Sequence, residues 1–154
     1  MKKLITSNHS LQDCMSISLD DCKEVYLVNS QIQMHNVDEC IRYLHSTTHS
    51  NYERLTTVDA FYTDGTITYL IEFKNQEPKD INKNKLKQKY FASRAILAPC
   101  ITENEIEYIL VTKNVDNHIN RKRKLERALT CLKYIDYNCK ISVLTPLEFE
   151  NKFA

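Results

Sequence analysis

The sequence predicts an α/β fold in which helices flank a mixed β-sheet, and three observations lead to this prediction. β-rich runs alternate along the chain with stretches whose apolar residues recur at helical spacing. The 154 residues include one glycine and three prolines, which are too few turn formers for a barrel of many hairpins. The length suits one hydrophobic core, so residues 1–154 are expected to form a single domain.

Composition excludes several classes of protein. A hydrophobic fraction of 42% beside a charged fraction of 27% is that of a globular protein and argues against extensive disorder. No segment approaches the roughly 20 apolar residues that cross a bilayer. The amino-terminal residues turn polar before the apolar region of a signal peptide could form. We therefore expect a cytoplasmic protein without a membrane partner.

The cysteines, the glycine and the net charge exclude further kinds of site. Six cysteines are scattered without a C-x-x-C pair, which indicates neither zinc nor a disulfide framework, so most are expected to be reduced and several buried. A single glycine excludes a Gly-rich phosphate loop. A formal net charge of +1 gives no overall attraction to a polyanion, so local basic patches would have to contact any nucleic acid.

The amino-terminal quarter of the chain predicts two strands and a short helix. Residues 1–21 indicate a strand followed by a short helix, with Ser10 or Asp13 as its cap. Residues 24–29 are a compact β-rich run bounded by polar residues, which is typical of a strand.

The middle of the chain predicts a helix and then a β-hairpin. A helix over residues 36–48, with Asn36 as N-cap, is indicated by the apolar spacing of Val37, Cys40, Ile41 and Leu44. Residues 56–62 and 67–74 are β-rich runs, and Asp64-Gly65 between them is a strong signal for a tight hairpin turn. The two runs should therefore pair as antiparallel strands.

The carboxyl-terminal half predicts alternating helices and strands. A helix is expected over residues 83–98, with Asp80 or Asn82 as its N-cap and Pro99 at its end. Its one apolar face would carry Leu86, Tyr90, Ser93 and Leu97. The remaining elements are expected to be a strand over residues 107–112, a helix over 119–134, a strand over 140–144 and a short helix after Pro146.

Three charged residues on the hairpin are the candidates for chemistry. Asp59 lies early in the first strand, and Glu72 and Lys74 lie late in the second, so antiparallel pairing places them at the same end of the hairpin. Glu72 and Lys74 are two residues apart and share one face of the strand, while Phe73 points to the other face. We therefore expect the three charged side chains to converge.

Such a convergence predicts a metal site. Two carboxylates that meet at one point repel each other unless a cation lies between them, and oxygen ligands suit Mg²⁺ or Mn²⁺. A metal held there polarises a phosphate oxygen and activates a water, and a neighbouring lysine can orient that water or stabilise developing negative charge. The residue types therefore indicate hydrolysis of a phosphodiester.

The sequence Thr57-Val58-Asp59, followed after a hairpin by Ile71-Glu72-Phe73-Lys74, resembles the PD-(D/E)xK nuclease superfamily, and the likeness extends over residues 56–112. That superfamily includes restriction endonucleases, Holliday-junction resolvases and nucleases of transposon ends. The resemblance implies a restriction endonuclease-like core and a metal held by Asp59, Glu72 and the carbonyl of Phe73. It also implies that Lys74 lies near the attacking water.

Two departures from the superfamily pattern concern its aspartate and its helix. Val58 replaces the proline that often precedes the aspartate. The superfamily's first helix corresponds either to residues 11–22, with residues 24–29 as the next strand, or to residues 36–48 in a varied topology. On the helix over residues 36–48, Asp38 is the candidate catalytic acid because it flanks the apolar stripe of that helix. The other candidates considered are Glu39, which lies nearly opposite the stripe, Asp13 and Glu53.

Basic clusters are the candidates for contact with nucleic acid. Lys85 and Lys89 are four residues apart on the helix after the motif and are predicted to contact backbone phosphates. The other lysines of that helix and the basic run Arg121, Lys122, Arg123 and Lys124 are typical of solvated helix faces. His45 and His49 have metal-ligand spacing, but without a third ligand they predict no site.

Two hypotheses of function follow. The first is a Mg²⁺-dependent or Mn²⁺-dependent nuclease acting on DNA, as in a restriction, repair or mobile-element system. The second is an inactive module on the same fold that binds nucleic acid or a protein. Retention of both acids and the lysine favours the first. The near-zero net charge favours the second, or a nuclease that needs a homodimer or a protein partner to hold its substrate.

Overall fold

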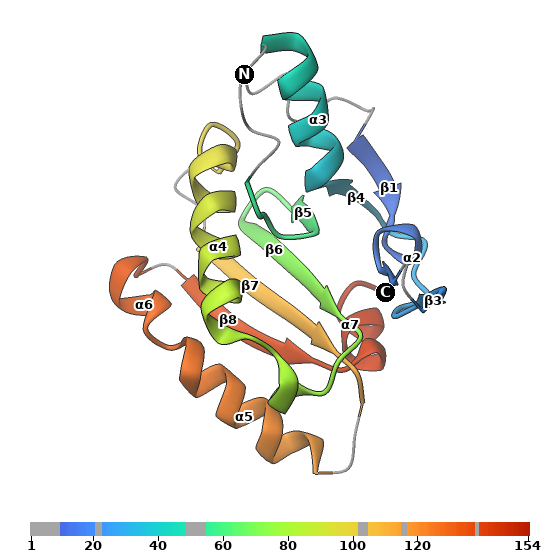
Figure 1. Cartoon of the computed structure of the whole chain (residues 1–154), viewed down its shortest axis with the longest axis vertical. Helices are drawn as coiled ribbons and strands as arrows, with labels where there is room; N and C mark the ends of the chain where they lie inside the picture. Colours follow the sequence, from blue (N-terminus) through green and yellow to red (C-terminus); the bar gives the residue numbers. More distant parts are fainter. Residues whose placement is uncertain (1–9, 21–22, 49–54, 102–104, 115–116, 138) are drawn as a thin grey trace.

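The computed structural model describes residues 10–20, 23–48, 55–101, 105–114, 117–137 and 139–154 (Figure 1). Within these ranges six strands form one mixed sheet in the order β1-β4-β5-β6-β7-β8. Neighbours from β1 through β6 are antiparallel, whereas β6, β7 and β8 run parallel to one another. The strands are β1 (Leu11–Asp13), β4 (Gln33–Asn36), β5 (Ala60–Thr63), β6 (Ile67–Lys74), β7 (Glu105–Thr112) and β8 (Cys139–Leu144).

Helices cover both faces of this sheet. α4 (Lys83–Leu97) and α5 (His118–Leu129) lie over one face, and α7 (Pro146–Lys152) lies on the other (Figure 1). One apolar cluster joins α4, α5 and α3 (Val37–Thr48) to the first face, and a second joins α7 and α2 (Cys14–Ile17) to the opposite face. The predicted α/β class, with a mixed sheet flanked by helices, is confirmed.

The β5–β6 hairpin forms around the predicted turn. Gly65 has a φ of 94°, which a residue without a side chain adopts freely, and Asp64 Oδ1 accepts hydrogen bonds from the N–H groups of Thr66 and Ile67 at 2.8 Å each. β6 has the predicted bounds, but β5 begins later than predicted, at Ala60. The preceding residues leave the sheet because the buried Val58 N–H donates to Ser93 Oγ of α4, at 2.8 Å.

Side-chain caps begin the helices that surround the site. Asn36 Oδ1 accepts from the Glu39 N–H at 3.2 Å at the start of α3, and Asn82 Oδ1 accepts from the Lys85 N–H at 3.1 Å at the start of α4. Asp13 accepts from the Ser16 N–H at 2.7 Å and caps α2. These caps agree with the predictions from the sequence.

Two elements differ from the predictions in the amino-terminal part. The strand predicted over residues 24–29 forms only in part, as β3 (Val25–Tyr26), in an exposed ribbon with β2 (Leu19–Asp20) outside the main sheet. The strands that do join the main sheet before α3 are β1 and β4, and β4 was not predicted from the sequence. A helix does form within residues 11–22, as α2 on one face of the sheet, and α3 packs on the other face. The strand expected to follow α2 in the first alternative does not join the main sheet.

The helix predicted over residues 119–134 is interrupted. It divides into α5 and a separate turn, α6 (Leu132–Ile135). At the break the N–H of Thr130 bonds to the carbonyl of Arg127 at 3.2 Å, and the Thr130 hydroxyl bonds to the carbonyl of Glu126 at 3.1 Å. A threonine hydroxyl that takes a helical carbonyl competes with the backbone ladder, and the helix ends there.

The structure also gives the state of the cysteines and the character of the helices. In the part of the chain that the structure describes, five cysteines lie outside disulfides and four of these are buried. No helix in the same part is long and apolar enough to span a bilayer.

Candidate functional site

Asp59 lies immediately before β5 and is bonded across the hairpin to β6. Its backbone N–H donates to the carbonyl of Ile71 at 3.0 Å. Its carboxylate Oδ2 accepts from the backbone N–H of Phe73 at 2.7 Å. These two bonds fix the direction of the Asp59 side chain and leave Oδ1 for other partners.

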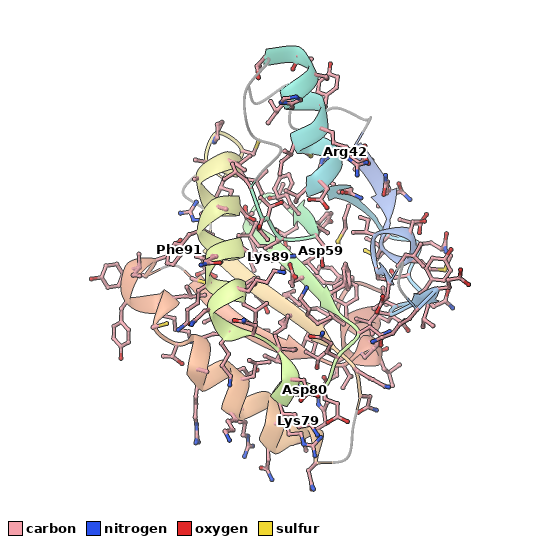
Figure 2. The ribbon with its side chains drawn as sticks, in the orientation of Figure 1. Arg42, Asp59, Lys79, Asp80, Lys89 and Phe91 are labelled. Atoms are coloured by element: carbon pink, nitrogen blue, oxygen red, sulfur yellow. The ribbon has the colours of Figure 1, made fainter. Side chains whose placement is uncertain are left out.

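Glu72 lies on β6 with no solvent-exposed surface, on the sheet face that α4 covers. Its Oε1 atom accepts from Lys89 Nζ of α4 at 2.7 Å and forms an ion pair with Lys74 Nζ. Lys89 Nζ also lies 3.3 Å from Asp59 Oδ1. Figure 2 shows Lys89 and Asp59 side by side in front of the sheet. The structure therefore brings together the three predicted catalytic residues, with Lys89 as the bridge between the two acids.

The second carboxylate oxygen of Glu72 has no hydrogen-bond partner among the described residues. Among the described residues, Glu72 Oε2 and Thr68 Oγ1 are the buried side-chain atoms without a hydrogen bond. An unsatisfied buried acceptor destabilises a protein by about 1–3 kcal/mol, and by more when it is charged. An acceptor retained in this state is a place for an additional donor or cation.

The pKa values of the acids reflect burial and mutual repulsion. Burial, followed by the negative charge of Asp59, raises the pKa of Glu72 to about 7, although both lysines oppose the shift. Burial alone would lower the pKa of Lys89, but the carboxylates of Asp59 and Glu72 outweigh it and raise that pKa. Partial burial and the charge of Asp59 raise the pKa of Asp38. Burial is thus the main cause of the raised pKa values of Glu72 and Asp38, and the negative charge of Asp59 adds to it.

A pH dependence of stability follows from Glu72. Its folded pKa of about 7 lies above the ordinary 4.5, so the folded state holds a proton that the unfolded chain has lost. This contribution is fully present below pH 4.5 and is lost as the pH rises through 7. Between these limits we expect the free energy of unfolding of the wild type to fall by roughly 3 kcal/mol relative to that of Glu72→Gln. Urea titrations of both proteins across this range measure the difference, and parallel pH profiles would contradict the assignment.

Asp38 lies in the first turn of α3 and belongs to the same region. The Val37 N–H donates to the carbonyl of Asp59 at 3.1 Å, which joins the start of the helix to the site. Thr57 Oγ1 donates to Asp38 Oδ1 at 3.4 Å. Asp38 therefore remains the candidate helical acid, beside Asp59.

The other acids considered for the helical position have different surroundings. Glu39 lies near Asp38 but forms an ion pair with Arg42 at 2.6 Å. Asp13 caps α2. Glu53 lies outside the described residues.

A cavity of about 580 Å³ opens beside these acids. Its volume is that of pockets that hold small ligands. The walls come from the segment around α2 and β2, from the start of α3, and from the end of β6 with the residues that follow. Its lining includes Asn36, Asp38, Arg42, Asp59, Phe73 and Lys74. Phe73 also contributes to the core, because its ring packs against Phe149 at a centroid distance of 5.4 Å on the opposite face of the sheet.

The two lysines predicted to contact phosphates lie in different environments. Lys85 is exposed on α4, whereas Lys89 is buried and bonded to the acids. The signal for this difference is the helical spacing of the buried residues of α4, because Lys89 falls on the stripe of Leu86, Tyr90, Ser93, Ile96 and Leu97. Ser93 Oγ also donates to the carbonyl of Lys89 at 2.8 Å, which ties this turn to the segment before β5.

Neither a cluster of metal-binding side chains nor a known relative identifies the site. Among the described residues, no group of three or more His, Cys, Asp or Glu side chains is placed to hold a metal ion. The oxygen ligands nearest to one another at the site are the carboxylates of Asp59 and Glu72, which share Lys89. No protein-family model, curated protein or solved structure matches the chain.

Proposed function

We propose that this protein is a metal-dependent nuclease with a restriction endonuclease-like core, acting on phosphodiester bonds in DNA. The observation that carries the proposal is that the carboxylates of Asp59 and Glu72 converge on one ammonium, that of Lys89, with Lys74 also on the Glu72 carboxylate. A scaffold has no need to bury a glutamate and hold it beside a second acid, whereas a catalytic site does. The proposal rests on this geometry together with the motif in the sequence.

The arrangement of the sheet supports the proposed core. A hairpin carries the acids, a helix follows, and a strand then returns parallel to the second hairpin strand. This is the order that the resemblance to PD-(D/E)xK nucleases implies for residues 56–112. α3 adds an acid, Asp38, at the same end of the hairpin.

Mg²⁺ or Mn²⁺ fits the donors of this site. Carboxylate and carbonyl oxygens are the ligands that these ions prefer, and Glu72 Oε2 is a buried acceptor without a partner in the described structure. Asp59, Glu72 and the carbonyl of Phe73 would hold the ion. When bound, it would polarise a phosphate oxygen and lower the pKa of a water molecule.

The protein's own groups have separate parts in this proposal. Lys74 is one quarter exposed, with 26% of its side-chain surface accessible, and lines the cavity, so its ammonium can reach a water molecule or a phosphate there. A positive charge in that position stabilises the negative charge that develops on a phosphate in the transition state. Arg42, on the opposite wall, and the exposed Lys85 are the side chains proposed to contact the flanking backbone. A homodimer or a protein partner would add the affinity for DNA that a net charge of +1 does not provide.

One observation favours the alternative, an inactive module that binds nucleic acid or a protein. Lys89 and Lys74 already neutralise one oxygen of Glu72, so the acids have a counter-ion from the chain itself. A survey of substrates separates the two hypotheses. The nuclease should cut duplex, branched or single-stranded DNA in Mg²⁺ or Mn²⁺ and stop in EDTA. The inactive module would bind one of these DNAs, or a protein, without cutting DNA under either condition.

Metal binding should also stabilise the protein. At a hundredfold excess over the dissociation constant, Mn²⁺ would add about 2.7 kcal/mol to the free energy of unfolding and raise the melting temperature by several degrees. Glu72→Gln should lose this increase. Glu107→Gln is the matched control, because Glu107 is also buried but bonds to Ser142 and Lys152. An equal increase in all three proteins, measured by differential scanning calorimetry, would place the metal elsewhere.

A further inference from the structure

Lys89 occupies the position that a cation between the two acids must take. Its ammonium lies 2.7 Å from Glu72 Oε1 and 3.3 Å from Asp59 Oδ1, and the described structure gives no other side chain that bonds to both carboxylates. We infer that Lys89 is a built-in counter-ion that a divalent metal must displace in order to bind. This inference rests on the proposed metal site and adds a regulation of its affinity.

The ammonium and the metal compete because they use the same oxygens. Asp59 Oδ2 already accepts the Phe73 N–H, so Oδ1 is the oxygen left for a cation, and Lys89 occupies it. A divalent ion beside a lysine ammonium would be repelled strongly in a site shielded from water. The metal and Lys89 in its present position therefore exclude each other.

The displacement must occur in the side chain of Lys89 and not in its backbone. Lys89 lies in the middle of α4, where Leu86, Tyr90 and Ser93 on the same face are buried. The carbonyl of Lys89 accepts from the Ser93 hydroxyl, which in turn accepts from Val58 N–H. The flexible four-carbon stem can instead swing its ammonium away from the acids.

Lys74 does not occupy the same position. Among the described residues its ammonium pairs with Glu72 and not with Asp59, and 26% of its side-chain surface is exposed, against 10% for Lys89. Lys74 can therefore remain beside Glu72 Oε1 while a metal takes Asp59 Oδ1 and the unpartnered Glu72 Oε2. The role of counter-ion falls on Lys89, and metal binding exchanges one internal cation for an external one.

Calorimetric titration with Mn²⁺ tests this exchange without any measurement of cleavage. Lys89→Met, which keeps most of the stem and removes the charge, should bind Mn²⁺ at least about tenfold more tightly than the wild type, since no ammonium competes. Lys89→Arg keeps the charge and should bind as weakly as the wild type. Lys87→Met is the control on the same helix, because Lys87 is half-buried and takes no part in the site.

A second measurement keeps the test valid if Lys89→Met folds poorly. Without its counter-ion the pair of acids repels, so the metal-free variant should melt below the wild type, and Mn²⁺ should restore more stability than it adds to the wild type. Lys89→Gln, which retains a hydrogen-bond donor, should show the same gain in affinity. Unchanged or weaker Mn²⁺ binding by the uncharged variants would overturn the inference.

The inference and the proposed function fail in different ways. Wild-type protein that cuts DNA in Mn²⁺, beside a Lys89→Met that binds Mn²⁺ no more tightly, would overturn the exchange and leave the nuclease standing. A gain of Mn²⁺ affinity in Lys89→Met, in a protein that never cuts DNA, would support the exchange and reject the nuclease. If neither protein binds Mn²⁺, the exchange is rejected and the cleavage survey alone decides the function.

Discussion

Replacement of Lys74 by Met is expected to lower the single-turnover rate of DNA cleavage by roughly a hundredfold or more, the scale of removing one preorganised electrostatic donor. The side chain pairs with Glu72 and lines the cavity, where it would act on the water or on the transition-state charge. Methionine keeps most of the aliphatic stem and removes the ammonium. DNA binding and the melting temperature should therefore change little, because the loss lies in the transition state.

Lys79→Met is the matched control for this prediction. Lys79 is exposed in the turn η3 (Pro78–Asp80), pairs with Glu77, and lies away from Asp59 and Lys89 in Figure 2. Its replacement should leave the rate near that of the wild type. If Lys74→Met cuts as fast as the wild type, Lys74 serves the structure alone, and the proposed mechanism is wrong.

Replacement of Asp59 by Asn should have a larger effect. The amide oxygen can still accept the Phe73 N–H, so the hairpin connection survives, but the site loses one of its two metal-binding carboxylates. Asparagine removes the negative charge of this metal ligand, and the activation of water by the metal depends on that charge. Cleavage should therefore fall on the order of a thousandfold or more. The stabilisation by Mn²⁺ should be lost as well.

Asp80→Asn makes the same chemical change at an exposed position distant from Asp59 (Figure 2). Its cleavage rate and its response to Mn²⁺ should match those of the wild type. Retention of Mn²⁺ binding and of cleavage by Asp59→Asn would remove this residue from the site. The pair of variants separates the loss of a ligand from a general effect of charge.

The hairpin and its acids could be predicted from the sequence because their signals are local. Asp64-Gly65 encodes a turn by its own chemistry, and once the turn is placed the register of the strands puts Asp59 opposite the end of β6. The two-residue period of a strand then places Glu72 and Lys74 on one face. No distant contact is needed for these inferences.

The amino-terminal strands depend on contacts that a local pattern does not contain. The run over residues 24–29 has the composition of a central strand, yet Val25 and Tyr26 are half exposed and pair only with β2. Gln33–Asn36 has a polar composition but joins the main sheet because it pairs with both β1 and β5. Strand preference reflects the surroundings in the fold more than the residue itself.

The role of Lys89 was missed for a related reason. A lysine four residues from another lysine suggests a solvated basic face, and charged residues are seldom buried without a partner. The partners here are Asp59 and Glu72, which come from a distant part of the chain. The helical stripe of α4 did contain the signal, because Lys89 shares its face with Leu86, Tyr90 and Ser93.

We propose that Asp59, Glu72 and Lys74 form a metal-dependent nuclease site, and cleavage of DNA by wild type and Glu72→Gln, purified in parallel, is the decisive experiment. The rate of product formation is measured in Mg²⁺, in Mn²⁺ and in EDTA. We expect cutting by the wild type in either metal, none in EDTA, and loss of cutting in Glu72→Gln. The absence of any product from the wild type, or equal cutting by both proteins, would contradict it.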